Sequence, residues 1–373
     1  MKNVLKNKVF WFITAAAVLV CAGFYLKFKI FSHPKIAVMQ KPGQVKSAET
    51  VTPVPEPPKL DFVAYDLKLE QIANNPVVAS STATSTEPSP RPSPIGRGSK
   101  ENLLWPVKTV YPNYGALLPF NRIVAYYGNL YSKGMGVLGE YTEDVMLDKL
   151  SSEVKKWQEA DPTTPVIPAL HYIVVVAQAG GGRDGKYRAR MPESEIKKVL
   201  AMADKIHGLV FLDIQVGQSN VQTEVPLLEK YLKLPNVHLG IDPEFAMHNG
   251  QRPGTVIGTL DAADFNFAAE YLAKIVRDNN LTPKVLIVHR FTQAMVTNAK
   301  KIQPLPEVQI VMDMDGFGGQ GAKLNTYQQY VYKEPIQFTG FKLFYKNDVV
   351  GGGMLTPQQL LKLTPIPVYI QFQ

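Results

Sequence analysis

Eight short runs rich in β-branched residues follow residue 121 and constrain the fold of this chain more than any other feature. Most are separated by an amphipathic or glycine-punctuated stretch, which is the pattern of parallel strands joined by crossovers. Eight such units in about 250 residues predict a (β/α)8 barrel, the TIM-barrel fold, with function at the carboxyl ends of its strands. The predicted strands are residues 122–127, 166–172, 209–215, 237–244, 284–289, 308–313, 338–344 and 367–372.

Charge and cysteine content exclude some classes of partner and site. The chain has 40 Lys and Arg against 32 Asp and Glu, a net charge of +8, and several of the lysines precede residue 42. No basic stripe with interleaved aromatic residues occurs, so we expect no nucleic-acid partner and interpret the excess as attraction to anionic lipid. Cys21 is the single cysteine, which excludes an internal disulfide and a cysteine-rich metal site.

The N-terminal region has the features of a membrane anchor. Residues 9–26 carry no charged side chain, and a helix of that length just spans a bilayer. We favour an uncleaved anchor that leaves residues 1–8 in the cytoplasm, which predicts a single-pass cell-membrane protein with an extracytoplasmic barrel. The alternatives are a cleaved signal peptide and a lipoprotein signal with its lipid on Cys21.

Residues 27–104 are predicted to form a linker between this anchor and a barrel domain at 105–373. Residues 52–58 and 80–94 are rich in Pro, Ser and Thr and contain too little apolar surface to fold. Residues 60–72 lie between them and are more apolar, a pattern compatible with either a strand or a short helix. A globular domain on a spacer is typical of proteins that act on cell-envelope polymers.

The connections at the two ends of the predicted barrel differ. Loops that lead from a strand to a helix are long and rich in glycine, whereas those that lead back are short, which predicts an elaborated carboxyl face. Residues 180–186 have the spacing of a phosphate-binding loop, but Tyr187 follows where Ser or Thr is required, so we reject that function. The alternatives for this segment are a mobile loop and an anion clamp formed by Arg183, Lys186, Arg188 and Arg190.

Two carboxylates end the fourth predicted strand. Asp242 and Glu244 stand two positions apart, hence on one side of the strand with roughly 6.6 Å between their Cα atoms. Like charges at that spacing raise one pKa and give a protonated acid beside an ionised carboxylate. Glycoside hydrolysis uses such a pair. The sixth strand repeats the arrangement at Asp313 and Asp315.

Other polar side chains at strand ends are expected to bind substrate. Each type also has an ordinary structural role, since an aspartate often caps a loop or helix and a buried histidine often fills a core. The expected substrate-binding residues are Tyr126, His171, Asp213, Gln215, His289, Arg290, Asp315, Lys342 and Tyr345.

The predicted barrel with Asp242 and Glu244 at the end of its fourth strand resembles retaining glycoside hydrolases of the TIM-barrel superfamily, such as muramidase-type lysozymes and chitinase-like barrels. The resemblance covers residues 237–247. The longer chitinase motif Asp-x-x-Asp-x-Asp-x-Glu is absent, because Leu239 and Gly240 stand upstream. The resemblance implies that Glu244 is the general acid/base and that Asp242 orients it or stabilises the transition state.

The sequence therefore predicts a membrane-anchored glycoside-hydrolase-like enzyme acting on peptidoglycan or another extracellular polysaccharide, without cofactor or metal. Its predicted catalytic residues are Glu244, Asp242 and Asp313. One alternative is a non-catalytic carbohydrate-binding barrel, in which Gln215 replaces a second acid and a groove is lined by Tyr126, Tyr127, Tyr131, Tyr141, Phe245 and Phe317. The other is a metal-dependent hydrolase with a divalent ion at His171, Asp213, Glu244, His289 and Asp313.

Overall fold

The computed structural model describes residues 59–76 and 103–373, which belong to one compact unit. The anchor predicted at residues 9–26 and most of the predicted linker lie outside these residues. Within the described ranges, no helix is both long and apolar enough to cross a membrane.

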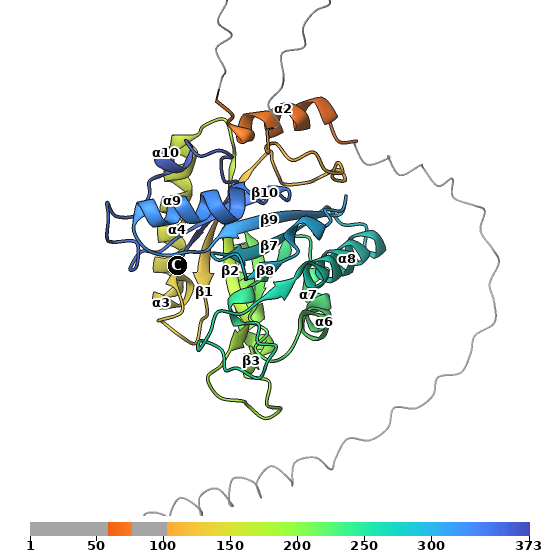
Figure 1. Cartoon of the computed structure of the whole chain (residues 1–373), viewed down its shortest axis with the longest axis vertical. Helices are drawn as coiled ribbons and strands as arrows, with labels where there is room; N and C mark the ends of the chain where they lie inside the picture. Colours follow the sequence, from red (N-terminus) through yellow and green to blue (C-terminus); the bar gives the residue numbers. More distant parts are fainter. Residues whose placement is uncertain (1–58, 77–102) are drawn as a thin grey trace, which may run out of the picture. The chain divides into compact units, whose positions relative to one another are not determined.

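Eight parallel strands close into a barrel (Figure 1), because β11 and β2 both pair with β1. All eight predicted strands are confirmed. In order around the barrel they are β1 (Arg122–Gly128), β2 (Val166–Ala177), β4 (Leu209–Ile214), β5 (Val237–Ile241), β7 (Lys284–Arg290), β9 (Val308–Met314), β10 (Phe338–Leu343) and β11 (Tyr369–Phe372).

The strand that carries the predicted acid pair is shorter than expected. β5 ends at Ile241, and Pro243–Phe245 forms a short 3-10 turn, η2. Proline lacks the N–H that a ladder needs and fixes its own φ, so the chain turns here. Asp242 and Glu244 therefore follow the strand instead of lying on it, and the predicted strand spacing between them is wrong.

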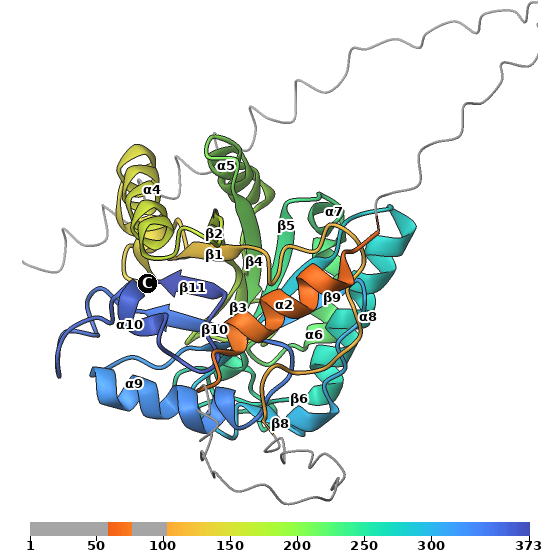
Figure 2. The ribbon, with the colours of Figure 1, turned by 90° about the horizontal axis from the view of Figure 1, so that it is seen from above.

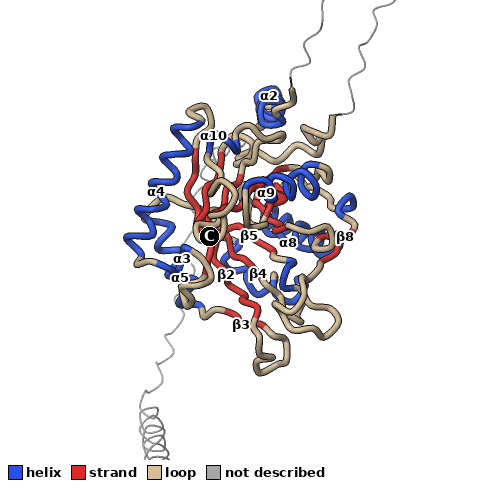
Figure 3. The backbone as a smooth tube through the Cα atoms, turned by 60° about the vertical axis from the view of Figure 1, so that its left-hand side comes forward, coloured by secondary structure: helices blue, strands red, loops and turns tan. Residues whose placement is uncertain are grey.

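Helices surround the strands, as Figures 2 and 3 show. The packing of α8 (Ala262–Asp278) is representative, because its buried residues Phe265, Ala269, Leu272 and Val276 recur every three or four positions. The other helices after residue 121 are α3 (Val137–Glu140), α4 (Glu143–Ala160), α5 (Glu193–Asp204), α6 (Val221–Glu224), α7 (Glu229–Leu232), α9 (Gln320–Thr326) and α10 (Pro357–Leu360).

Several shorter strands and turns lie outside the eight-stranded barrel. β3 (Arg188–Arg190) pairs antiparallel with the extended end of β2, and β6 (Leu260–Asp261) pairs with β8 (Val296–Thr297) in a separate sheet. Short 3-10 turns η1 (Pro226–Leu228) and η3 (Ala299–Lys301) and a π-helical turn η4 (Tyr327–Tyr332) complete the described elements.

The side chains inside the barrel change from apolar to polar along its axis. Its lower layers, near the starts of the strands, are apolar and include Ile123, Phe211, Val285, Val311 and Phe338. Higher up, the inward positions carry charged and polar side chains in place of the branched apolar residues that usually fill such barrels. These residues are His171, Asp213, His289, Asp313, Lys342 and Gln371, all buried.

A helix that precedes the barrel packs onto its lower end. α2 (Phe62–Ala73) falls within the 27–104 range interpreted as a linker, and it makes most of the ambiguous segment 60–72 helical. Tyr65 and Ile72 are buried with Leu118 in the apolar cluster of the lower interior. The Ile72 carbonyl also accepts a hydrogen bond from the Ile366 N–H at 2.7 Å. The folded unit therefore includes residues before 105.

We predict that the buried face of α2 stabilises the barrel. Ile72→Ala should lower the free energy of unfolding by about 2–5 kcal/mol, because Ile72 is 8% exposed and its removal leaves a cavity. Val63→Ala is the matched control, with a change within about 0.5 kcal/mol, since Val63 is 71% exposed. Urea unfolding of the two variants measures both values. Equal small effects would mean that α2 does not contribute to the barrel's stability.

Candidate functional site

A cavity of about 710 Å³ lies at the carboxyl ends of the strands, the face that the loop lengths predicted. Most of its wall comes from residues at or just after strand ends. Its polar lining includes Gln215, Asp242, Glu244, Asp315, Lys342, Asn347 and Gln373, and its aromatic lining is Tyr127, Phe245, Phe291, Phe317 and Phe344.

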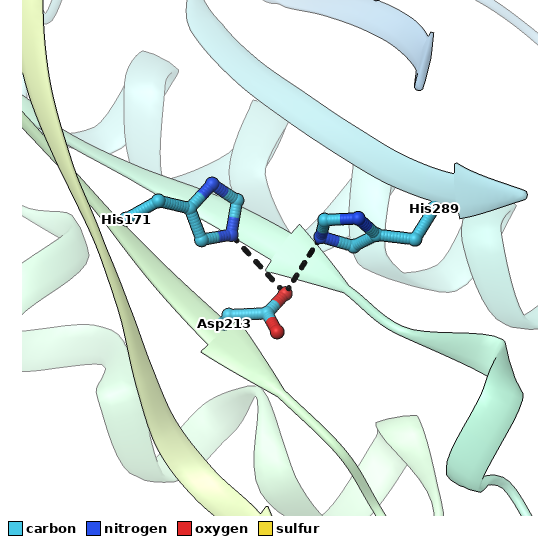
Figure 4. A group of neighbouring side chains, drawn as sticks. All are labelled: His171, Asp213 and His289. Atoms are coloured by element: carbon cyan, nitrogen blue, oxygen red, sulfur yellow. Dashed lines mark ion pairs between the residues drawn. The ribbon is translucent and has the colours of Figure 1, made fainter. Parts of the chain in front are cut away.

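Two histidines and an aspartate converge beneath this pocket (Figure 4). Asp213 Oδ1 lies 3.3 Å from His171 Nε2 and 3.4 Å from His289 Nε2. All three side chains are fully buried. The Tyr127 hydroxyl donates to the other carboxylate oxygen, Asp213 Oδ2, at 3.1 Å, so Tyr127 links this cluster to the pocket that it lines.

A charged network continues from His289 to the pocket wall. His289 Nδ1 lies 3.1 Å from Asp315 Oδ2, and Asp315 Oδ1 lies 2.9 Å from Lys342 Nζ. Lys342 Nζ also sits 3.8 Å from the centroid of the Tyr127 ring. Burial of unpaired charges is costly, so a cluster of this kind persists only when opposite charges meet within it.

The network shifts the pKa of its members in opposite directions. Burial lowers the pKa of His171 to about 4. Burial also disfavours a charged His289, but Asp213 and the carboxyls of Asp313 and Asp315 outweigh it and hold the pKa of His289 well above its usual value. For Asp213 burial acts upward, yet the two histidines dominate and lower its pKa.

Glycine at one inward position makes this convergence of side chains compatible with the barrel. Gly240 on β5 pairs with Asp213 on β4, and β5 lies between β4 and β7, the strands that carry Asp213 and His289. A β-carbon at Gly240 would overlap Asp213 Oδ1 and His171 Nε2. The missing side chain thus lets residues from strands on both sides of β5 approach each other.

The predicted acid pair lies in the pocket. Asp242 Oδ1 accepts the Glu244 backbone N–H at 3.0 Å, and Asp242 Oδ2 accepts the Gln215 amide at 3.1 Å. Burial, with the charges of Asp242 and Asp315, raises the pKa of Glu244 to about 8. Burial likewise raises the pKa of Asp242 to about 7. Both pKa values are raised, whereas the sequence predicted one protonated and one fully ionised carboxyl.

The structure sorts the predicted site residues into three groups. Gln215, Asp242, Glu244, Asp315 and Lys342 line the pocket. Four others are buried beneath the pocket and are not among the described residues that line it, namely His171, Asp213, His289 and Asp313. On the outer side of the strands, packed among helices and loops, are Tyr126, Arg290 and Tyr345.

Asp313, which the sequence predicted to be catalytic, lies outside the lining of the cavity. Its side chain is fully buried, with Oδ2 3.5 Å from His289 Nδ1. Among the described residues it finds no hydrogen-bond partner, and burial raises its pKa. We therefore assign it to the layer below the pocket and give it no contact with substrate.

Tyr126, Tyr345 and Arg290 were predicted to bind substrate, and the structure places all three outside the lining of the cavity. The Tyr126 and Tyr345 hydroxyls lie 2.9 Å apart, and Tyr345 donates to Glu153 of α4 at 3.1 Å. Arg290 pairs with Glu334 at 2.6 Å and donates to backbone carbonyls. Tyr126 and Arg290 each stand one residue from an inward side chain, so strand alternation turns them outward.

Several pocket residues were not among the predicted site residues. Tyr127 is the inward neighbour of Tyr126, and Phe291 and Phe344 directly follow the last residues of β7 and β10. Of the six aromatic residues considered for a carbohydrate groove, Tyr127, Phe245 and Phe317 line the cavity. His171, Asp213 and His289 all point into the barrel. The same alternation of side chains, applied to the first strand, would have identified Tyr127 and not Tyr126 as the inward residue.

Two residues of the considered anion clamp are already engaged within the chain. Arg188 and Arg190 bind the buried carboxylate of Glu224, at 2.8 and 2.7 Å. Arg188 also pairs with Asp184 at 2.8 Å. Their charges are thus compensated by the protein, which disfavours an anion clamp at these two arginines.

Comparison with known proteins identifies no family. Neither a protein-family model nor a curated protein matches the chain. A cellobiohydrolase II (Cel6A) from Humicola insolens, solved in complex with glucose and cellotetraose, is 12% identical, with a TM-score of 0.24. The match covers 58% of this chain and 61% of that enzyme, so this chain spans less than two thirds of its length. Likeness at this level indicates neither a shared family nor a shared activity.

We predict that Arg290 stabilises the fold and does not bind substrate. Arg290→Ala should lower the free energy of unfolding by about 3–5 kcal/mol, because it leaves Glu334 and several carbonyls without their buried partner. Arg277→Ala, which removes an exposed pair with Glu307, should cost at most about 1 kcal/mol. Chemical denaturation measures both. A stable Arg290→Ala protein with impaired ligand binding would contradict this assignment.

Proposed function

We propose that this chain is a glycoside-hydrolase-like enzyme that cleaves a polysaccharide in the pocket at the carboxyl ends of the barrel strands. Glu244 is its general acid and protonates the glycosidic oxygen of the leaving sugar. The observation that carries the proposal is the position of Glu244, a pocket-lining carboxyl whose pKa is raised to about 8. At neutral pH it holds the proton that an acid catalyst must supply.

Asp242 supports Glu244 in two ways. Its Oδ1 accepts the Glu244 backbone N–H, which fixes the turn that presents the acid. Its carboxyl group also raises the pKa of Glu244 through like-charge repulsion. Asp242 lines the same cavity, and we assign it the second role that the sequence suggested, stabilisation of the positive charge that develops on the sugar ring.

The remaining lining suits a saccharide. Tyr127, Phe245, Phe291 and Phe344 supply flat apolar faces of the kind on which sugar rings pack, while Gln215 and Asn347 offer amide groups for hydroxyls. Phe317 is 66% exposed and stands edge-on to Phe344, with ring centroids 5.9 Å apart. It extends this apolar surface toward the solvent, as a chain-like substrate requires.

The cellular setting of the proposal comes from the sequence. Residues 9–26 act as a single-pass membrane anchor with the barrel on the extracytoplasmic side, and the substrate is peptidoglycan or an exopolysaccharide. A Pro/Ser/Thr-rich spacer places the pocket away from the membrane surface. No nucleic-acid partner is expected.

The proposal predicts that Glu244→Gln abolishes glycan cleavage. Purified full-length protein should release reducing ends from peptidoglycan or from one member of a polysaccharide panel, and Glu244→Gln should reduce the rate by roughly 100- to 10,000-fold. The control is Glu159→Gln, which changes an exposed glutamate of α4 and should leave the rate unchanged. The full chain is used because α2 packs onto the barrel.

Two results would count against this function. Equal release by the parent and Glu244→Gln would exclude Glu244 as the acid. Retention of the protein on a polysaccharide that it does not cleave would favour the carbohydrate-binding alternative. The amide Gln215 beside Asp242 would then stand where a second acid is expected.

The pH profile provides an independent prediction. Glu244 acts as an acid only when protonated, so the rate should fall as the pH rises through about 8. The carboxyls of Asp242 and Asp315 add to burial in raising this pKa, while Lys342 and His289 oppose it. Asp242→Asn removes one negative charge and should move the alkaline limb to lower pH. An alkaline limb that stays in place, or moves to higher pH, would contradict this electrostatic account.

A further inference from the structure

Three buried atoms beneath the pocket face one another without hydrogen-bond partners. They are His171 Nε2, Asp213 Oδ1 and His289 Nε2, and none of them is satisfied by any residue that the structure describes. A buried polar atom normally has a partner, and three unpartnered ones at a common point indicate an absent group that all three contact. We propose that these atoms bind one divalent transition-metal cation of the Zn²⁺ class.

The two distances from Asp213 Oδ1 to the histidine nitrogens fit such an ion. Ligands bound at about 2.0–2.1 Å in a tetrahedral arrangement lie about 3.3–3.4 Å from one another. Asp213 Oδ1 lies 3.3 Å from His171 Nε2 and 3.4 Å from His289 Nε2. One atom from each of the three side chains lies within 4.8 Å of the other two. Two imidazoles and one carboxylate are a donor set that Zn²⁺ and neighbouring metals accept.

Each ligand is also oriented by a second contact. Histidine ligands generally donate their other ring N–H to an oxygen, which fixes the tautomer with a free nitrogen toward the metal, and ligating carboxylates are held in the same way. His171 and Asp213 have such a hydrogen bond here, and His289 has an ion-pair contact with a carboxylate. These contacts are His171 Nδ1 to the Tyr369 hydroxyl at 2.6 Å, His289 Nδ1 to Asp315 Oδ2 at 3.1 Å, and the Tyr127 hydroxyl to Asp213 Oδ2 at 3.1 Å.

Gly240 provides the room that the ligands need. A β-carbon at this position would overlap two of the proposed ligand atoms, Asp213 Oδ1 and His171 Nε2. Gly240 therefore allows ligands from β2 and β4 to meet His289 from β7 across the intervening strand β5. The ligands come from three strands, so the cation would hold the upper barrel together.

The charges around the cluster favour an added cation. Asp213, Asp313 and Asp315 contribute three carboxyl groups to this buried layer, where Lys342 pairs directly with Asp315 and His289 lies within 3.5 Å of all three. A divalent ion between Asp213 and His289 supplies positive charge where a carboxylate is buried. Tyr127 separates the ion from the pocket, because it lines the cavity and contacts Asp213. We therefore assign the cation a structural role that is independent of the proposed reaction.

Metal binding by the full-length protein tests this inference without reference to activity. After treatment with a chelator, the protein is titrated with Co²⁺, whose visible absorption bands report imidazole and carboxylate coordination, and then with Zn²⁺. We expect one Co²⁺ per chain, displacement by Zn²⁺, and a Tm that rises with Zn²⁺ concentration, since an ion that binds only the folded state stabilises it.

Three variants locate the site. Asp213→Asn removes the charged ligand and should weaken Zn²⁺ binding by at least about 100-fold, while Tyr127→Phe removes only a supporting contact and should weaken it by about 10- to 100-fold. Gly240→Ala places a methyl group against two ligand atoms and should abolish binding. His238→Gln is the matched control, because His238 is another buried histidine of the barrel outside the cluster, and its variant should keep the ion.

The inference is overturned if the folded parent protein binds no stoichiometric Co²⁺ or Zn²⁺, or if Asp213→Asn binds them as tightly as the parent. Either result would leave Asp213 as an anion held between two histidine N–H groups, with His289 carrying the positive charge. Near-ultraviolet circular dichroism checks that each variant is folded. If Gly240→Ala does not fold, Asp213→Asn and Tyr127→Phe decide the matter.

Discussion

Side chains on a barrel strand alternate between the interior and the surrounding helices, and the rest of this structure depends on that constraint. A step of one residue separates Tyr127, which lines the pocket, from Tyr126, which packs beside Tyr345 on the outer side. The same step separates His289 in the interior from Arg290, which binds Glu334 and backbone carbonyls. Polar residues at strand ends are therefore of two kinds, and the inward kind alone reaches the cavity.

The inward set at the upper end of the barrel consists largely of charged groups, and their mutual pairing shapes the pocket above them. Asp213 lies between two histidines, His289 reaches Asp315, and Asp315 binds Lys342. The same buried and partly compensated environment raises the pKa of Glu244. The proposed acid chemistry and the proposed cation site thus share one physical origin, although each is tested separately.

Much of the fold was predictable because β-branched runs mark buried parallel strands whatever their exact ends. All eight strands were located in this way. The end of β5 was not, although Pro243 offered a signal, since proline cannot continue a ladder. Residues 60–72 were ambiguous because a short apolar segment fits a strand or a helix until its packing partner, the lower barrel, is known. In the candidate site, residue type was enough to identify the acid pair and the histidines. The direction of each side chain could be predicted only by knowing which positions of each strand face the barrel interior.

The proton held by Glu244 is the central physical claim of this account, and its titration tests that claim most directly. Infrared difference spectra of the parent protein and Glu244→Gln, recorded across pH, isolate the signal of this one carboxyl group. The account predicts a protonated carboxyl at pH 7 that ionises near pH 8. A Glu244 that ionises near its ordinary pKa of 4.5 would be charged at neutral pH, and the proposed acid catalyst would not exist.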